Sequence, residues 1–336
     1  MLVNVGKLMS HTSTKGGGGF NPSLVDAWFM SGLSNNDKPT QIVGVKKNKL
    51  QLKNFAYALD SGFGKYTVNW DSFYGSNGVN ANFTNSDSVI HLTEILVADG
   101  KFLQTNADGT IEACQIKVEG ITDDIKLRYV SYAEDGTGTY TYLKNGINNL
   151  PISYKKYTGF AASVVGTCNI TITQLPSAYE GALVFDGVDD YGMCTGLPIL
   201  DDYTVVCRRV IENKSNNVVA SKSAVVGNGA FIFEIYDNNK NSTWSFRVQN
   251  DVDINYNDSV SWQTKKSYNG EKNLVVGSGS DTDTLCLGLL REKDSRCLKG
   301  AIYYFALYDK SLTPEEVEEE KVKLENYWEG GKNELA

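Results

Sequence analysis

Histidine, paired cysteine and long apolar runs are scarce in this chain of 336 residues, and each scarcity excludes a class of protein. Two His and six scattered Cys without a Cys-x-x-Cys pair offer no recognisable transition-metal site. No stretch is apolar enough to span a bilayer, and the opening residues lack the core of a signal peptide. We therefore expect no membrane insertion, free and mostly buried thiols, and a chain that stays in the cytoplasm or leaves it by lysis.

An excess of basic residues is also missing, because the formal net charge is −8. A nucleic-acid-binding surface needs a basic face that neutralises phosphates, so we expect no nucleic acid as partner. The sign is uneven along the chain: residues 1–53 contain seven Lys, no Arg and two acidic residues, which gives +5 there and −13 in the remainder. This basic end either docks on an acidic partner or forms a solvated, Lys-rich face.

What the chain does contain favours β-structure. Hydrophobic residues make up 41% and charged residues 21%, as in ordinary globular proteins, and the 19 Tyr and 13 Phe are accompanied by frequent Asn, Thr and Gly. A length of 336 residues exceeds what one hydrophobic core usually serves. We therefore expect about two domains, each a sandwich of antiparallel strands.

The order of segments along the chain predicts where these domains lie. Residues 1–20, which end in the stretch SHTSTKGGGGF, have the composition of an anchor followed by a Gly-rich, flexible hinge. Strand candidates follow at residues 24–30 and 50–59. From residue 65 to 176, and again from 182 to 308, short strands alternate with turns rich in Asn, Asp and Gly, which is typical of antiparallel sandwiches.

One convincing helix closes the pattern. Thr313 and Glu316 have the spacing of a capping box around Pro314, a residue well suited to the first helical position. An apolar stripe follows, and we expect the helix to end at Gly330-Gly331 after packing that stripe on a sandwich. The stripe consists of Val317, Leu324 and Trp328.

Two motifs carry a resemblance to a known family. ALVFDGVDDYGMC (182–194) is similar to the opening strand and turn of laminin-G-like (concanavalin A-like) jelly rolls, and LKGAIYYFALYDKSLTPEEV (298–317) resembles their closing strand and helix. LVDAWFMSGLSNND (24–37) and LQLKNFAYALDSGFG (50–64) look like the family's early strands. Three closing-strand positions depart from the charged residues that family members often carry, which implies an unusually aromatic outer face. They are Tyr303, Tyr304 and Ala306.

The early motifs lie more than a hundred residues before the later ones, and an insertion explains this gap. We expect an all-β fold of two antiparallel β-sandwiches (jelly rolls) plus a short C-terminal helix. Residues 21–64 plus 177–330 would form a discontinuous laminin-G-like domain. Residues 65–176 would form an inserted sandwich that resembles a carbohydrate-binding module, and residues 1–20 would be the anchor and hinge.

The overall arrangement also resembles proteins from phages of gut Bacteroides, the crAss-like group included, in which laminin-G-like modules occur on virions. This resemblance implies a virion structural protein, either a head fibre or a tail-associated decoration, with the virion as its location. It further implies a homo-oligomer, dimer or trimer, that joins other virion proteins through residues 1–20. Host surface or mucus glycans are the implied external partners.

Sugar binding would require aromatic rings on one exposed face, because the apolar faces of sugars stack on rings. Tyr140 and Tyr142 lie on the same side of a strand expected at residues 139–143, and Tyr129 and Tyr132 are close in sequence. Tyr129, Tyr132, Tyr140 and Tyr142 are the candidate carbohydrate-binding set, and Tyr154 and Tyr157 are also nearby in sequence. The alternative, and the more common use of Tyr in sheets, is packing in cross-strand pairs.

A second candidate site is acidic. Asp186, Asp189 and Asp190 stand together in a turn, and carboxylates from loops are ligands that calcium prefers. Calcium is therefore the one candidate cofactor. The alternative is that these residues form the turn itself, because Asp side chains bond to nearby backbone N–H groups.

Catalytic patterns are absent, so we expect no enzyme. The only histidines are His11 in the hinge and His91 in a strand, and neither accompanies a G-x-S-x-G nucleophile motif. The acidic E-x-D-x-x-E pattern of sandwich glycoside hydrolases is missing as well. The nearest acidic groupings have the composition of turns or of a solvated helical face. They are Asp186/Asp189/Asp190, Asp201/Asp202, Asp281/Asp283 and Glu315–Glu320. Two alternatives stay open: a glycan-binding lectin-type module without a structural role, and a glycoside hydrolase.

Overall fold

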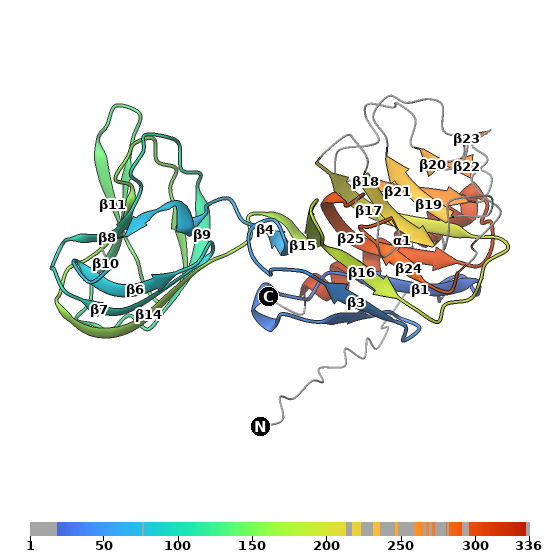
Figure 1. Cartoon of the computed structure of the whole chain (residues 1–336), viewed down its shortest axis with the longest axis horizontal. Coiled ribbons are helices and arrows are strands. Elements are labelled where there is room, and N and C mark those ends of the chain that lie inside the picture. The colour runs from blue at the N-terminus through green and yellow to red at the C-terminus, as the bar shows by residue number, and fades with distance from the viewer. Residues whose placement is uncertain are drawn as a thin grey trace, which may run out of the picture.

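The computed structural model describes residues 19–75, 77–212, 217–222, 231–235, 246–247, 259–264, 267–268, 271–272, 280, 282–290 and 296–333. Residues 1–18, which hold most of the expected anchor and hinge, lie outside these ranges. Figure 1 shows two bodies of β-strands side by side, joined where β4 (Gly62–Lys65) and β15 (Ala178–Asp186) meet. We call them the first sandwich, which contains both chain ends of the described part, and the inserted sandwich.

The first sandwich consists of two sheets. The eight-stranded sheet runs in the order β23 (Glu271–Lys272), β22 (Ser267–Tyr268), β21 (Ser259–Thr264), β17 (Thr204–Ile211), β25 (Lys299–Tyr308), β15 and β4, with β1 (Leu24–Phe29) also paired to β25. The seven-stranded sheet runs β2 (Gln41–Val43), β3 (Lys49–Lys53), β16 (Tyr191–Cys194), β24 (Leu285–Leu287), β18 (Asn217–Lys222), β19 (Phe231–Ile235) and β20 (Phe246–Arg247). The pairing is antiparallel except between β19 and β20.

Strand β25 joins the early and late parts of the first sandwich. One of its sides pairs with β17 along most of its length, whereas the other pairs with β1 near Tyr308 and with β15 near Lys299. Nine of its ten residues are buried, all but Lys299. A bulge at Tyr303 interrupts the alternation of its side chains, so Ile302 and Phe305 both enter the core between the two sheets, while Tyr303 and Tyr304 both face the other way.

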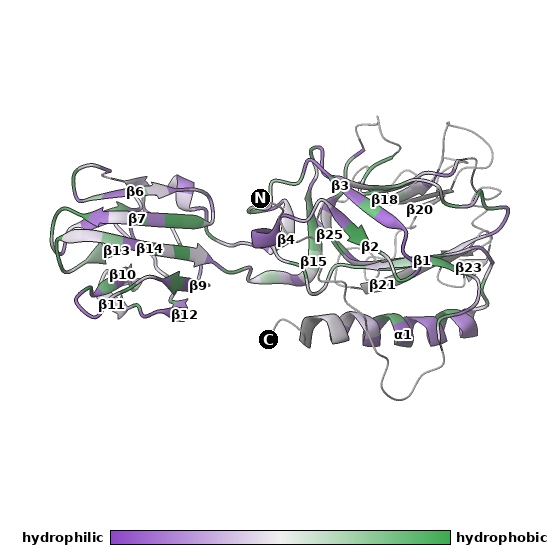
Figure 2. Ribbon diagram, turned by 90° about the horizontal axis from the view of Figure 1, so that it is seen from below, coloured by the Kyte–Doolittle hydropathy of each residue, from purple (hydrophilic) through white to green (hydrophobic). Residues whose placement is uncertain are grey.

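The other face of β25 is covered by α1 (Pro314–Asn333), which lies along one side of the first sandwich in Figure 2. The predicted apolar stripe packs there, and the Trp328 ring meets Tyr303 edge-on at 5.3 Å. The predicted aromatic outer face is therefore not exposed: helix α1 buries it. The capping box is confirmed by two reciprocal bonds, Thr313 N–H to Glu316 Oε2 (2.8 Å) and Glu316 N–H to Thr313 Oγ1 (3.2 Å).

The predicted end of this helix is wrong. Helix α1 continues through Gly330 and Gly331 to Asn333. Gly331 is buried against Ser31, and a Cβ there would lie 2.5 Å from Ser31 Oγ. Gly331 therefore does not end the helix. Its missing side chain lets α1 approach the turn that follows β1.

The inserted sandwich also consists of two antiparallel sheets. One runs β11 (Gly138–Tyr142), β10 (Leu127–Tyr132), β13 (Gly159–Ala162), β8 (Lys101–Gln104) and β5 (Tyr74–Gly75); the other runs β12 (Gly146–Leu150), β9 (Cys114–Glu119), β14 (Gly166–Gln174), β7 (Val89–Ile95) and β6 (Ala81–Asn85). Their facing side chains form one core, in which Trp70 and Phe160 are fully buried. The predicted all-β fold of two antiparallel sandwiches is thus confirmed.

The chain enters and leaves the inserted sandwich at one place. Strand β4 pairs with β15, so the outgoing Lys65 lies opposite the returning Ala178. Just beyond, the buried Gln174 accepts bonds from Thr67 N–H (3.1 Å) and Val68 N–H (2.9 Å) through its Oε1. These contacts hold together the two segments that connect the sandwiches, the outgoing one and the returning one.

One strand prediction fails beside these sheets. The strand expected at residues 50–59 ends at Lys53, because Asn54, Tyr57 and Leu59 adopt positive φ and turn the chain. Two short 3-10 helices, η1 (Asn35–Asp37) and η2 (Trp70–Ser72), complete the described elements.

All six cysteines lie in the described ranges and are free thiols, as predicted, and four of them are buried. Within the described part of the chain, no helix has both the length and the apolarity that crossing a membrane requires.

The glycine pair in α1 yields a matched test. Gly330→Ala should raise the free energy of unfolding by about 0.5–1 kcal/mol, because no atom lies within 4 Å of the new methyl and a helical glycine costs backbone entropy. The free energy of unfolding of Gly331→Ala should be about 1–3 kcal/mol lower than that of Gly330→Ala, because the new methyl at position 331 overlaps Ser31. Urea unfolding of both variants measures this order, and equal stabilities would contradict the close packing of Gly331.

Candidate functional site

The candidate carbohydrate-binding tyrosines belong to one sheet of the inserted sandwich, on neighbouring strands. Strand β10 pairs with β11, which brings Arg128 opposite Tyr142 and Val130 opposite Tyr140. Directly opposed residues share a face of the sheet, and residues two apart along a strand share it too. Arg128, Tyr132, Tyr140 and Tyr142 therefore point outward together.

Tyr129 does not belong to this face. It alternates with Arg128, so it points inward and is only 1% exposed. Its ring lies 5.3 Å from that of Phe160 in the core. The prediction grouped Tyr129 with the other tyrosines because they are close in sequence. On β10, however, its side chain points to the face of the sheet opposite to that of Arg128 and Tyr132.

Tyr140 and Tyr142 are the exposed aromatic residues of the edge strand. Their side chains are 58% and 61% exposed. The guanidinium of Arg128 lies over the Tyr140 ring at 4.7 Å, and Arg128 also pairs with Asp99 at 2.9 Å. Tyr140 therefore makes the predicted kind of cross-strand contact, whereas the Tyr142 ring remains open to stack on a ligand.

Tyr132 is half-buried and lies in a group that the sequence did not reveal. The Lys101 ammonium donates to the Tyr132 hydroxyl and to the Tyr157 carbonyl, both at 2.8 Å. Tyr157 itself is 42% exposed, in a loop where its φ is +68°. We call the side chains of Lys101, Arg128, Tyr132, Tyr140, Tyr142 and Tyr157 the tyrosine face. Three of these residues, Lys101, Arg128 and Tyr157, lie outside the predicted set. Lys101 is distant from β10 in sequence, and the pairing of β8 with β13 and of β13 with β10 brings it to this face.

The three aspartates of the second candidate site do come together. One ligand oxygen from each of Asp186, Asp189 and Asp190 lies within 4.8 Å of the others. Asp186 is half-buried, Asp189 is exposed and Asp190 is 1% exposed. Three carboxylates at this spacing are a donor set that suits a hard divalent cation.

The same aspartates also build the turn between β15 and β16. Asp186 Oδ1 accepts the Val188 N–H at 2.7 Å, while Gly187 supplies a φ of +82°. Asp190 accepts the Ser61 hydroxyl (3.0 Å) and the Asp186 N–H (3.1 Å), one on each oxygen. Both predicted alternatives therefore have support from geometry, because each carboxylate oxygen keeps a second lone pair.

Asp190 has the most perturbed acidity in this group. Burial, aided by the negative charge of Asp186, raises the pKa of Asp190 to about 7, although its two hydrogen bonds oppose the rise. A buried carboxyl group with such a pKa can act as a general acid in glycosidases. Here its oxygens are enclosed by Ser61 and the turn, which leaves no access for a sugar.

The remaining catalytic candidates serve local structure. His91 lies in β7 with its Nδ1 3.3 Å from Thr171 Oγ1, on the neighbouring strand. Asp202 accepts from the Tyr203 N–H and the Ser311 hydroxyl, and Asp283 accepts from the Gly196 N–H. His11 and Asp281 lie outside the described residues.

Comparisons with known proteins do not assign a family. No family model matches the chain, and no curated protein matches it. Among solved structures, similar chains include the Trypanosoma rangeli sialidase with the inhibitor DANA (TM-score 0.25, 9% identity) and the same sialidase with sialic acid (TM-score 0.24, 10% identity). Each alignment covers 83% of this chain and 67% of the sialidase. At these TM-scores the likeness supports no conclusion about fold or function.

The raised pKa of Asp190 predicts how stability depends on pH. Between pH 4 and pH 7 the folded state keeps the Asp190 proton while the unfolded state releases it, so this group lowers the free energy of unfolding as pH rises and has no further effect above about pH 7. The loss amounts to a few kcal/mol at most, since one pH unit corresponds to about 1.4 kcal/mol. Asp190→Asn cannot ionise and should show a flatter profile. Urea unfolding of both proteins between pH 5 and pH 8 measures the difference, and identical slopes would contradict it.

Proposed function

We propose that this protein is a non-catalytic virion component that adheres to host or mucus glycans through the tyrosine face. The observation that carries the adhesion is the exposure of Tyr140 and Tyr142, at 58% and 61%, on the edge strand β11. Exposed rings contribute little to folding but offer flat apolar surfaces to sugars. Cationic and hydroxyl groups beside them, from Lys101 and Tyr132, supply the polar contacts that orient a ligand.

The way in which the two sandwiches are joined suits display. The two connecting segments lie side by side at β4 and β15, so the inserted sandwich is attached to the first sandwich at a single place (Figure 1). Its sheets therefore remain available to a ligand. The virion assignment comes from the resemblance to laminin-G-like modules of gut-phage proteins. In this proposal residues 1–20 attach the chain to other virion proteins, and identical copies assemble as a dimer or trimer.

A substitution that removes the exposed ring of Tyr142 tests the proposed adhesion to glycans. Tyr142→Ala should weaken glycan binding roughly tenfold, because removal of a central aromatic anchor typically costs more than 1 kcal/mol. The full chain is first screened on a glycan array, and the strongest binder is then titrated calorimetrically against both proteins. Ile147→Ala is the matched control, because Ile147 is 60% exposed on β12 in the other sheet of the same sandwich. An empty array, or equal affinities for Tyr142→Ala and wild type, would refute the proposal.

Removal of residues 1–20 tests the attachment. The shortened chain should fold with unchanged secondary structure, because the buried residues of the three hydrophobic clusters lie at or beyond Leu24 and only the partly buried Phe20, which contacts Tyr327, is lost from them. It should nevertheless fail to join particles when it replaces the full chain during phage assembly. Mass spectrometry of purified particles measures the incorporation, and normal incorporation of the shortened chain would show that the attachment lies elsewhere.

Calcium is the ligand we propose for Asp186, Asp189 and Asp190, as a structural ion of the first sandwich. Binding needs ionised carboxylates, so calcium should stabilise the protein above the pKa of Asp190, about 7, and much less at pH 5. The Asp190→Asn protein described above should lose this dependence.

A further inference from the structure

The Lys101 ammonium occupies a fixed position on the tyrosine face without a carboxylate partner among the described residues. Its two hydrogen bonds go to neutral acceptors, the Tyr132 hydroxyl and the Tyr157 carbonyl, each at 2.8 Å. The rings of Tyr132 and Tyr157 lie 5.2 and 5.8 Å from the same nitrogen. An ammonium has three donors, so one N–H and the full charge remain available to a ligand.

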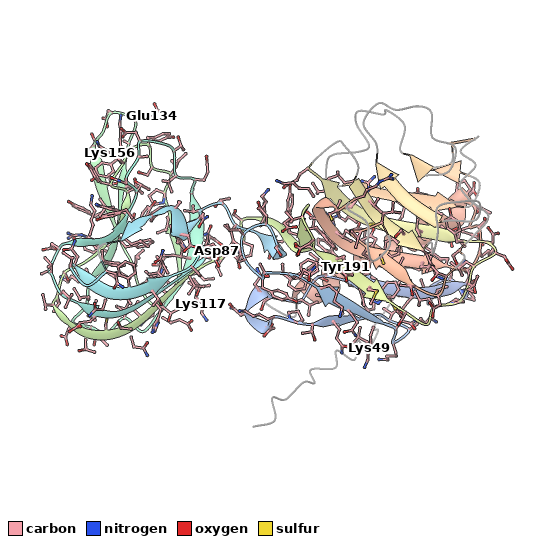
Figure 3. All side chains as sticks on the ribbon, viewed as in Figure 1. Lys49, Asp87, Lys117, Glu134, Lys156 and Tyr191 are labelled. Atoms are coloured by element: carbon pink, nitrogen blue, oxygen red, sulfur yellow. The ribbon has the colours of Figure 1, made fainter. Side chains whose placement is uncertain are left out.

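A second ammonium lies beside the same tyrosine. Lys156 Nζ is 5.2 Å from the centre of the Tyr157 ring, and the side chain is exposed. Tyr157 thus has two cations around it, Lys101 and Lys156. In Figure 3, Lys156 is labelled at the end of the inserted sandwich that also holds Glu134, away from Lys117.

The acidic groups of this region have other partners or lie apart from the two lysines. Asp99 pairs with Arg128 at 2.9 Å. Asp108 accepts the backbone N–H of Lys156 at 3.1 Å, and Asp135 accepts the N–H of Thr137 at 2.8 Å. These carboxylates keep their charges, but among the described residues none of them forms an ion pair with Lys101 or Lys156.

We propose that the tyrosine face selects acidic glycans, whose carboxylate or sulfate group binds between Lys101 and Lys156. The inference rests on the proposed function and adds the class of ligand to it. A sugar ring stacks on Tyr142 or Tyr157, and the anion accepts a charge-assisted hydrogen bond from the free Lys101 donor. Because Tyr132 and Tyr157 hold Lys101 in place, little side-chain entropy is lost on binding.

The test compares matched pairs of oligosaccharides with the full chain. Sialylated, sulfated and uronate-containing glycans are each titrated beside the neutral counterpart, which is desialylated, desulfated or methyl-esterified. At least one acidic member should bind about tenfold more tightly than its counterpart. The preference should shrink when salt rises from about 0.05 to about 0.5 M, because the contact is solvent-accessible.

Variants separate this inference from the proposed function. Lys156→Gln should remove the preference for the acidic member and leave the neutral glycan's affinity unchanged. Lys101→Gln should weaken binding of the acidic member more than binding of the neutral one, whereas Tyr142→Ala should weaken both equally. Lys156→Gln needs no new packing, because that side chain is exposed. Lys117→Gln is the control, since Lys117 pairs with Glu119 on the opposite sheet.

Each outcome has one meaning. Acidic preference that disappears in Lys101→Gln or Lys156→Gln supports the inference. Equal affinity within every pair, or a preference that survives both substitutions, overturns the inference but leaves adhesion intact. Absence of binding to every glycan overturns the proposed function and this inference together.

Discussion

The burial of β25 on both of its faces is the constraint on which the rest of the first sandwich depends. Ile302 and Phe305 fill the core between the sheets, while Tyr304 and Tyr308 point to the other side and donate hydroxyl bonds to Glu325 and Glu320 of α1. A strand that is apolar on both faces needs a cover on each, so the C-terminal helix is a requirement of this sheet. The same strand pairs with β1 and β15, which ties the early segment to the late one across the insertion.

That tie explains how a whole sandwich fits inside another without disrupting it. The first sandwich needs only that Lys65 and Ala178 lie opposite each other, and the ladder between β4 and β15 ensures this. The inserted core closes on itself, with Gln174 bonded to the backbone of its first residues. Each sandwich thus has its own hydrophobic core, and the paired strands β4 and β15 connect the two.

The sequence predicted those features that depend on local chemistry. Alternation of side chains predicted the sandwiches, and the reciprocal bonds of Thr313 and Glu316 follow directly from their spacing. Predictions from the sequence failed where a residue distant in the chain determines the local structure. Gly331 resembles a helix stop until Ser31 is seen against it, and Tyr129 resembles Tyr132 until the sheet assigns opposite faces to them. The aspartate turn was found because its members are adjacent in sequence, whereas Lys101 reaches the tyrosine face only through the pairing of β8 with β13 and of β13 with β10.

The tyrosine face illustrates why position in a sheet matters more than residue type. Tyr304 and Tyr140 are chemically identical, yet one lies under a helix at the centre of a sheet and the other lies on an edge strand that nothing in the described structure covers. An exposed edge with bare rings is a liability for association, and sheets usually limit it with charge. Here the charges are Arg128, which lies over Tyr140 and pairs with Asp99, and the cation of Lys101 beside Tyr132, which has no such partner among the described residues. Cations protect the edge from a second copy of itself by repulsion, and they leave it attractive to a ligand that carries the opposite sign.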